Sequence, residues 1–180
     1  MSAVNLEINK FIDNISTEVA KTFEKKMNPF SYPKIKYISI TSGVGKLDNK
    51  AKDEVANYLE KLVGQKINKI KSKKAISGFK LRKGDIVGLR ATLRGKKVYD
   101  FLLNLIYITL PRTRDFRGIK ADSFDSNFKT YSLGIPSAAI FPAIGFDTQT
   151  DFGIQANIVF ATAGENNKVL LEKLNFPFVK

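Results

Sequence analysis

Apolar residues recur at steps of three and four positions in four stretches of the chain. In residues 1–27 this spacing includes Val4, Ile8 and Ile15, which predicts an amphipathic N-terminal helix that ends before Asn28-Pro29. The same spacing predicts three further helices, over residues 50–63, 96–109 and 165–174.

Shorter stretches rich in β-branched residues predict five strands, over residues 34–41, 67–71, 87–93, 131–135 and 154–161. The elements follow the order αβαββαββα. Short strands alternating with helices and hairpins favour an α+β fold, a mainly antiparallel sheet with helices packed on one face. No repeat or linker divides the chain, so we expect a single domain over residues 1–180.

Two stretches show neither the helical spacing of three and four residues nor the pattern of a strand. Residues 72–84 are basic and contain glycine, which predicts an extended loop or a hairpin. Residues 111–129 follow a proline and are rich in Arg, Ser and Asp, which predicts a long irregular connection.

The chain is strongly basic, with 30 Lys and Arg against 17 Asp and Glu, a formal net charge of +13. This excess favours a polyanionic partner, nucleic acid before an anionic membrane. The chain has no histidine and no cysteine, which excludes zinc fingers, disulfides, thiol nucleophiles and imidazole bases. We expect no cofactor and no metal. The longest apolar run, residues 101–110, is too short for a bilayer, so we expect a soluble protein.

The stretch 71–84 contains six cations and one aromatic residue, Phe79, beside Gly78. Unpaired RNA is bound by cations on its phosphates and aromatic rings on its bases, and this stretch supplies both. The alternative is a solvated loop with Phe79 turned into the core. Residues 87–93 alternate, which puts Arg90, Thr92 and Arg94 on one strand face. That row either binds an RNA backbone or is the solvated face of an ordinary sheet.

Three of the six arginines lie close together, at Arg112, Arg114 and Arg117. Arginine is preferred where a planar group must grip a phosphate or carboxylate. These side chains either contact RNA or pair with nearby acids and shape the connection. Those acids, Asp115, Asp122 and Asp125, could alternatively hold Mg²⁺ for a nuclease or phosphotransferase. The stretch Ser42–Leu47 fails as a phosphate-binding loop, because Ile40 and Leu47 replace its required residues.

Several motifs together resemble the bacterial-type family of large ribosomal subunit protein five. They run in order from about residue 28 to the C-terminus: Asn28-Pro29, Tyr32-Pro33-Lys34-Ile35, Gly43-Val44-Gly45, Gly64-Gln65-Lys66, residues 73–82, Thr92-Leu93-Arg94-Gly95, residues 110–118, Ser123-Phe124-Asp125, Phe141-Pro142 and Pro177-Phe178. The arginine-rich block and Ser77-Gly78-Phe79-Lys80-Leu81-Arg82 are the most distinctive.

The resemblance implies a non-catalytic protein that helps to seat 5S rRNA in the central protuberance of the large ribosomal subunit. It implies an antiparallel sheet with its open face on 5S rRNA, and Lys34, Thr41, Phe79 and Thr92 at or near that surface. The family usually has lysine at Tyr37, so a phosphate contact there is lost or replaced by stacking. With the strand row added, the candidate 5S rRNA residues are Lys34, Tyr37, Thr41, Phe79, Arg90, Thr92 and Arg94.

The loop 75–84 would project towards P-site tRNA. Its candidate residues, with two preceding lysines, are Lys73, Lys74, Ser77, Gly78, Lys80, Arg82 and Lys83. The other expected partners are 23S rRNA, neighbouring proteins of the protuberance and the small-subunit head, with no membrane. The chain departs from the family pattern at Thr41-Ser42, Lys129-Thr130 and Ala143, which favours a divergent bacterial lineage or an organelle. We therefore expect ribosome-bound protein in the cytoplasm or an organelle matrix.

Overall fold

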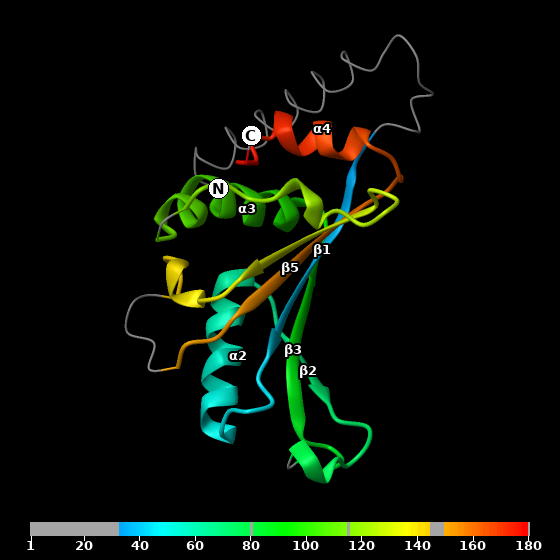
Figure 1. Ribbon diagram of the computed structural model, residues 1–180. Coiled ribbons are helices and arrows are strands. Elements are labelled where there is room, and N and C mark those ends of the chain that lie inside the picture. The colour runs from blue at the N-terminus through cyan, green and yellow to red at the C-terminus, as the bar shows by residue number, and fades with distance from the viewer. Residues whose placement is uncertain (1–32, 80, 115, 145–149, 180) are drawn as a thin grey trace.

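Figure 1 shows the computed structural model of the chain, which describes residues 33–79, 81–114, 116–144 and 150–179. The helix predicted over residues 1–27 lies outside these ranges, and so do Lys80 and Asp115.

Among the described residues, five strands form one antiparallel sheet in the order β2-β3-β1-β5-β4. Their bounds are Ile35–Gly43 for β1, Asn68–Lys71 for β2, Ile86–Leu93 for β3, Thr130–Ile135 for β4 and Ile154–Phe160 for β5. The predicted α+β class is therefore confirmed. The first strand of the sequence lies at the centre, between β3 and β5. This arrangement joins both halves of the described chain, and the single domain over residues 1–180 stays a prediction that a single cooperative unfolding transition would test.

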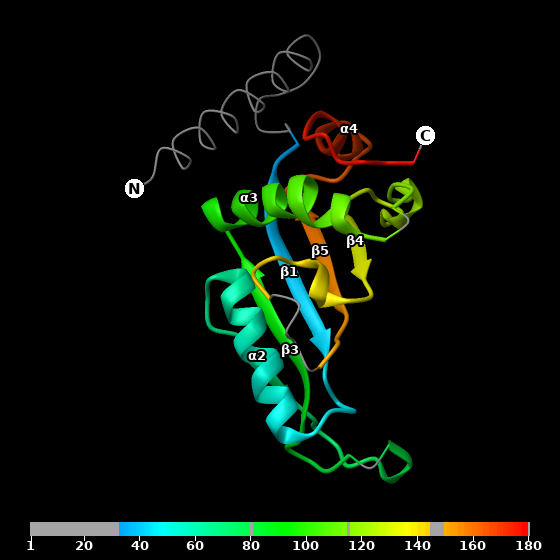
Figure 2. The same ribbon diagram turned by 90° about the vertical axis from the view of Figure 1, so that its left-hand side faces the viewer.

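Three α-helices in the described ranges accompany the sheet: α2 at Asn49–Val63, α3 at Lys96–Leu103 and α4 at Asn166–Lys173. Both α2 and α3 lie on the same face of the sheet, whereas α4 lies beyond the end at which β1 begins (Figures 1 and 2). The apolar stripes predict this placement, because Val55 and Leu59 of α2 and Phe101 of α3 are buried. Gly64 ends α2 in the left-handed conformation, at φ 65°.

The helix predicted over residues 96–109 changes type along its length. It is α-helical to Leu103, continues as a π-helix over Asn104–Thr109 and ends in a 3₁₀ turn over Leu110–Arg112. Pro111 has no N–H group to continue the helical hydrogen bonds. The Thr109 hydroxyl donates to the Asn104 carbonyl at 3.1 Å across the wider turn. The apolar stripe persists, with Leu105 and Ile106 buried, so spacing alone predicts the helix but not its change of type.

Residues 72–84 form the end of the β2–β3 hairpin, here called the hairpin end. The backbone N–H of Ser72 donates to the Asp85 carbonyl at 2.8 Å, and that of Gly84 to the Ser72 carbonyl at 3.0 Å. Ile76 and Leu81 form an isolated bridge around a 3₁₀ turn over Ser77–Phe79. Of the two predicted alternatives, the hairpin is the one formed. The hairpin end projects from the molecule at the opposite end from α4 (Figure 1).

An aromatic cluster packs around Tyr131 on β4. The tyrosine is fully buried, with its ring centroid 4.7 Å from Phe124, 5.5 Å from Phe176 and 5.8 Å from Phe178. Its hydroxyl donates to the Lys120 carbonyl at 3.0 Å. Burial raises the pKa of Tyr131 to about 12, and a hydrogen bond with the Ser123 side chain opposes part of that rise.

We expect this buried phenol to make stability fall between pH 10 and 12. The pKa in the folded state lies above the unfolded value of about 10. The contribution is therefore complete below about pH 10 and is lost as the pH rises through about 12. Urea unfolding of the wild type and Tyr131→Phe across this range tests it, since lysine titration is common to both. The wild type should lose stability more steeply, and parallel profiles would contradict the assignment.

Candidate nucleic-acid interface

The face of the sheet opposite α2 and α3, here called the open face, carries the polar set of alternating side chains. Directly paired residues of antiparallel strands share a face, and Arg90 pairs with Thr41 while Thr92 pairs with Ser39. The alternation predicted for β3 is confirmed, because Leu89, Ala91 and Leu93 are buried while Arg90 and Arg94 are exposed. No helix among the described residues covers this face (Figure 1).

Arg90 is held in place by the strand beside it. Its Nε donates to the Oγ of Ser39 at 3.1 Å, and Ser39 is itself buried. Because a guanidinium has five N–H donors, this bond orients the fork and leaves further donors for a ligand. A pre-oriented guanidinium loses less rotamer freedom on binding a phosphate than a free one.

Arg94 is held by an aromatic ring instead. Its Cζ lies 5.7 Å from the ring centroid of Tyr37, a half-buried residue of β1. Such a contact is attractive because the ring face carries partial negative charge. Tyr37 stands where the resembled family usually has lysine, so here the aromatic ring supports a neighbouring cation instead of supplying one.

The other two predicted residues near the sheet lie on β1 or just before it. Thr41 is half-buried on the open face, with its hydroxyl 3.5 Å from the Gln155 carbonyl. Lys34 is exposed, and its carbonyl accepts from the Ala161 N–H at 2.8 Å. Lys34 therefore lies at the end of the sheet where β5 finishes.

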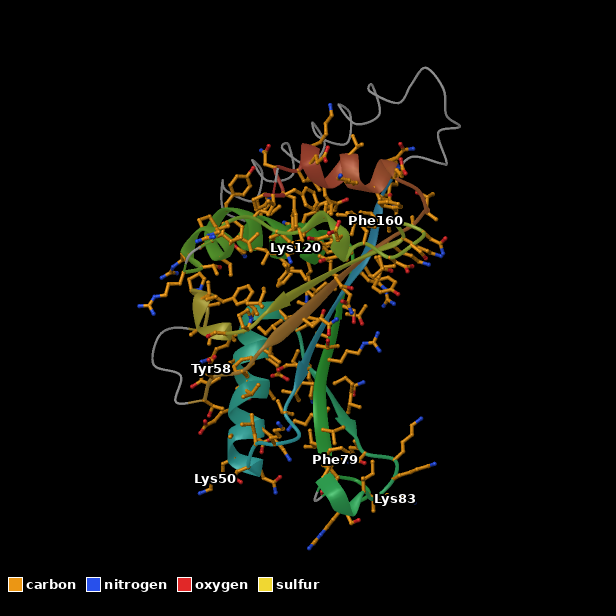
Figure 3. The ribbon with its side chains drawn as sticks, viewed as in Figure 1. Lys50, Tyr58, Phe79, Lys83, Lys120 and Phe160 are labelled. Carbon is orange, nitrogen blue, oxygen red and sulfur yellow. The ribbon has the colours of Figure 1, made fainter. Side chains whose placement is uncertain are left out.

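Phe79 is separated from these residues along the hairpin. It is 75% exposed, which excludes the alternative that its ring belongs to the core. The predicted residues around it that the structure describes are exposed as well: Lys73, Lys74, Ser77, Gly78, Arg82 and Lys83. Phe79 and Lys83 lie at the projecting end of the molecule (Figure 3). Phe79 thus groups with the predicted tRNA-facing residues and not with the arginines of the sheet.

The arginine-rich connection is anchored by its backbone. Gly118 has φ +98°, and a Cβ there would lie 3.0 Å from Val179 Cγ2. The next residue pairs with the C-terminus, because the Ile119 N–H donates to the Pro177 carbonyl at 2.8 Å. The glycine is therefore required both by its conformation and by the close approach of the C-terminal residues.

The three arginines of this connection are exposed. Within the part of the connection that the structure describes, Arg114 and Arg117 form no ion pair with Asp122 or Asp125. The carboxylate of Asp125 accepts instead from the Ser126 N–H at 2.9 Å. No group of three or more potential ligands that could hold a metal ion occurs in the ranges the structure describes, which leave out Asp115.

On β4 and β5, three polar residues and one glycine of the open face are absent from the predicted set. Ser132 and Gly134 on β4 face Asn157 and Gln155 on β5, and the apolar residues between them are buried. The same period-two alternation that identified Arg90 runs through both strands, so the signal was present in the sequence.

None of the helices in the described ranges is both long and apolar enough to cross a membrane.

Known proteins match this chain over nearly its whole length. A family profile described as ribosomal protein L5 matches residues 28–82, and a second profile, described as the C-terminus of the same ribosomal family, matches residues 86–178. The large ribosomal subunit protein uL5 of Borreliella afzelii is 40% identical over 177 residues, 96% of each chain.

Two relatives from other lineages match equally well. The uL5 protein of Mycoplasma mycoides is 42% identical over 181 residues, 97% of this chain and 98% of the relative. The protein uL5c of Cyanidium caldarium is 41% identical over 184 residues, 99% of each. Identity at this level over at least 96% of each chain confirms the resemblance found in the motifs, and the chain belongs to the ribosomal protein L5 (uL5) family.

Proposed function

We propose that this protein is a structural component of the large ribosomal subunit that binds 5S rRNA through its open face. The observation that carries the proposal is the pair of arginines on that face, each oriented by a β1 side chain: Arg90 by Ser39 and Arg94 by Tyr37. The chain belongs to a family of structural ribosomal proteins and is not an enzyme, which excludes the nuclease alternative.

The geometry fits a folded RNA better than a small anion. The arginines sit on a broad sheet surface and lie near neutral polar residues, so several phosphates and sugars can be contacted at once. The net charge of +13 supplies long-range attraction to any polyanion, and the fixed side chains make contacts at defined positions.

A gel-shift titration of the protein against 5S rRNA tests the proposal, with tRNA and duplex DNA as competitors. We expect 5S rRNA to bind most tightly, and log affinity to fall with log salt by roughly 0.7–0.9 for each phosphate neutralised. Equal binding to all three nucleic acids would show that the protein binds polyanions non-specifically through its net charge, and it would refute a specific 5S rRNA site.

We further propose that the hairpin end contacts P-site tRNA. Its exposed cations surround Phe79, whose ring is free to stack on an unpaired base. Its projection from the rest of the molecule would let it reach a second RNA while the sheet holds the first (Figure 3).

Phe79→Ala should weaken RNA binding by about tenfold, since stacking contributes about 1–3 kcal/mol per base. Because the ring is 75% exposed, the melting temperature should stay at the wild-type value. Gel shifts with 5S rRNA and tRNA, and a thermal melt, measure both. Tyr107→Ala, an exposed aromatic on the π-helix, is the matched control. A lower melting temperature with unchanged RNA binding would show that the ring is structural.

We also infer contacts with 23S rRNA, with neighbouring proteins of the central protuberance and with the small-subunit head. The exposed arginines Arg112, Arg114 and Arg117 are candidates for them. Ribosome-bound protein in the cytoplasm or an organelle matrix is the corresponding location. Sedimentation of a cell extract should place the protein with large subunits, and its recovery only in the free fraction would contradict this inference.

A further inference from the structure

The open face divides into a charged half and a neutral half. Arg90 and Arg94 belong to β3 and its end, whereas β4 and β5 present Ser132, Gln155 and Asn157. Thr41 on β1 joins the halves, because it pairs with Arg90 on one side and with Gln155 on the other. A surface that only attracted phosphates would have no need of a separate uncharged half.

The neutral half contains a shallow groove of about 420 Å³, whose lining includes Thr41, Gly43, Gly134, Gly153 and Gln155 and is uncharged throughout. Two of the glycines have no structural reason to be glycine. A Cβ at Gly43 or Gly134 would meet no atom within 4 Å, and neither residue has a positive φ. Glycine weakens a strand, and no bulge interrupts the strand pairing at either position, so its use there favours the close approach of another molecule to the backbone.

The two amides beside the groove orient each other. Gln155 Nε2 donates to Asn157 Oδ1 at 3.2 Å. This bond leaves the side-chain oxygen of Gln155, Oε1, as an acceptor and the side-chain NH₂ group of Asn157 as a donor for a ligand. A hydroxyl group can serve both, because it donates and accepts. The RNA minor groove is wide and shallow and displays a row of 2′-hydroxyls.

We propose that the groove and the Gln155–Asn157 pair bind the sugar edge of an RNA minor groove and read its 2′-hydroxyls. The inference rests on the proposed binding of 5S rRNA and assigns different roles to the two halves of the face. The arginines contact phosphates and supply affinity and salt dependence. The uncharged half contacts sugars and supplies selectivity for RNA over DNA.

Binding to 5S rRNA made with 2′-fluoro nucleotides at every position tests the proposal, since this RNA keeps an A-form geometry but lacks the 2′-hydroxyls. The wild type should bind it about fivefold more weakly than natural 5S rRNA. Gln155→Ala and Asn157→Ala should bind natural 5S rRNA about three- to tenfold more weakly and no longer distinguish the two RNAs. Asn57→Ala, which removes an exposed amide from α2, should behave as wild type. Wild-type protein that binds both RNAs equally, or amide variants that still discriminate, would overturn the proposal.

Gly134→Val separates binding from folding. Because the position is open and valine favours strands, its melting temperature should equal or exceed that of the wild type. The added side chain fills the groove, so affinity for 5S rRNA should fall at least fivefold. Unchanged affinity would refute the groove as a contact. A different result would refute the proposed binding of 5S rRNA itself, namely that the wild type binds 5S rRNA no better than tRNA or duplex DNA.

Discussion

Tyr131→Ala should lower the free energy of unfolding by about 3–5 kcal/mol, the usual cost of removing a large ring from a core. The residue is fully buried between β4 and the C-terminal residues, with Phe124, Phe176 and Phe178 around it. Alanine would leave a cavity among these rings and would leave the Lys120 carbonyl without its donor. The loss is a large part of the stability of an ordinary domain.

Urea unfolding followed by circular dichroism measures the loss, with Tyr131→Phe as the intermediate case. The phenylalanine variant keeps the ring and removes only the hydroxyl, so it should cost about 0.5–1.5 kcal/mol for each hydrogen bond lost. If the alanine variant does not fold, the phenylalanine variant still tests the assignment. A loss below about 1 kcal/mol for the alanine variant would show that the cluster is not part of the cooperative core.

This cluster gives a structural role to two of the family motifs, Ser123-Phe124-Asp125 and Pro177-Phe178. Phe124 lies in the connection after the arginines and Phe178 lies at the C-terminus, and the two rings meet at 6.4 Å. The backbone of Ile119 pairs with Pro177 and Val179 beside them. The long connection is therefore fastened at its centre by aromatic packing and by backbone hydrogen bonds to the end of the chain.

The elements themselves could be predicted because their signals are local. The spacing of Val55 and Leu59 predicts a helix with one buried face, and the alternation of Leu89 and Arg90 predicts which side of a strand is buried. The order of the strands could not be predicted in the same way. That β1 lies between β3 and β5 depends on pairings across more than 100 residues, such as Ile40 with Ala156, which local periodicity does not record.

The candidate site was predictable to the same extent. Alternation placed Arg90, Thr92 and Arg94 on one face, but it could not say whether a helix covered that face. The side chains that orient the arginines, Ser39 and Tyr37, come from a strand some 50 residues earlier and are visible only once β1 and β3 pair. The exposure of Phe79 likewise follows from the hairpin, because Phe79 lies at the projecting end of that hairpin (Figure 3).

Replacing both arginines of the open face by alanine should reduce affinity for 5S rRNA by about 100-fold or more at physiological salt. A hydrogen bond to a charged group contributes about 1.5–3 kcal/mol, and the double variant loses at least two of them. If each arginine neutralises one phosphate, the slope of log affinity against log salt should become shallower by roughly 1.4–1.8 units. Melting temperatures should change little, since both side chains are exposed.

Two further double variants separate geometry from charge. Arg90→Lys with Arg94→Lys keeps both charges but loses the planar fork and the contact with the Tyr37 ring, so affinity should fall while the salt slope stays near wild type. Lys50→Ala with Lys61→Ala removes two exposed cations from α2, on the other side of the sheet, including one that lies 5.9 Å from the Tyr58 ring centroid. This variant should bind within about threefold of wild type, since distant surface charges are largely screened. If it lost as much affinity as the arginine variant, the net charge of the protein would explain binding and the open face would have no special role.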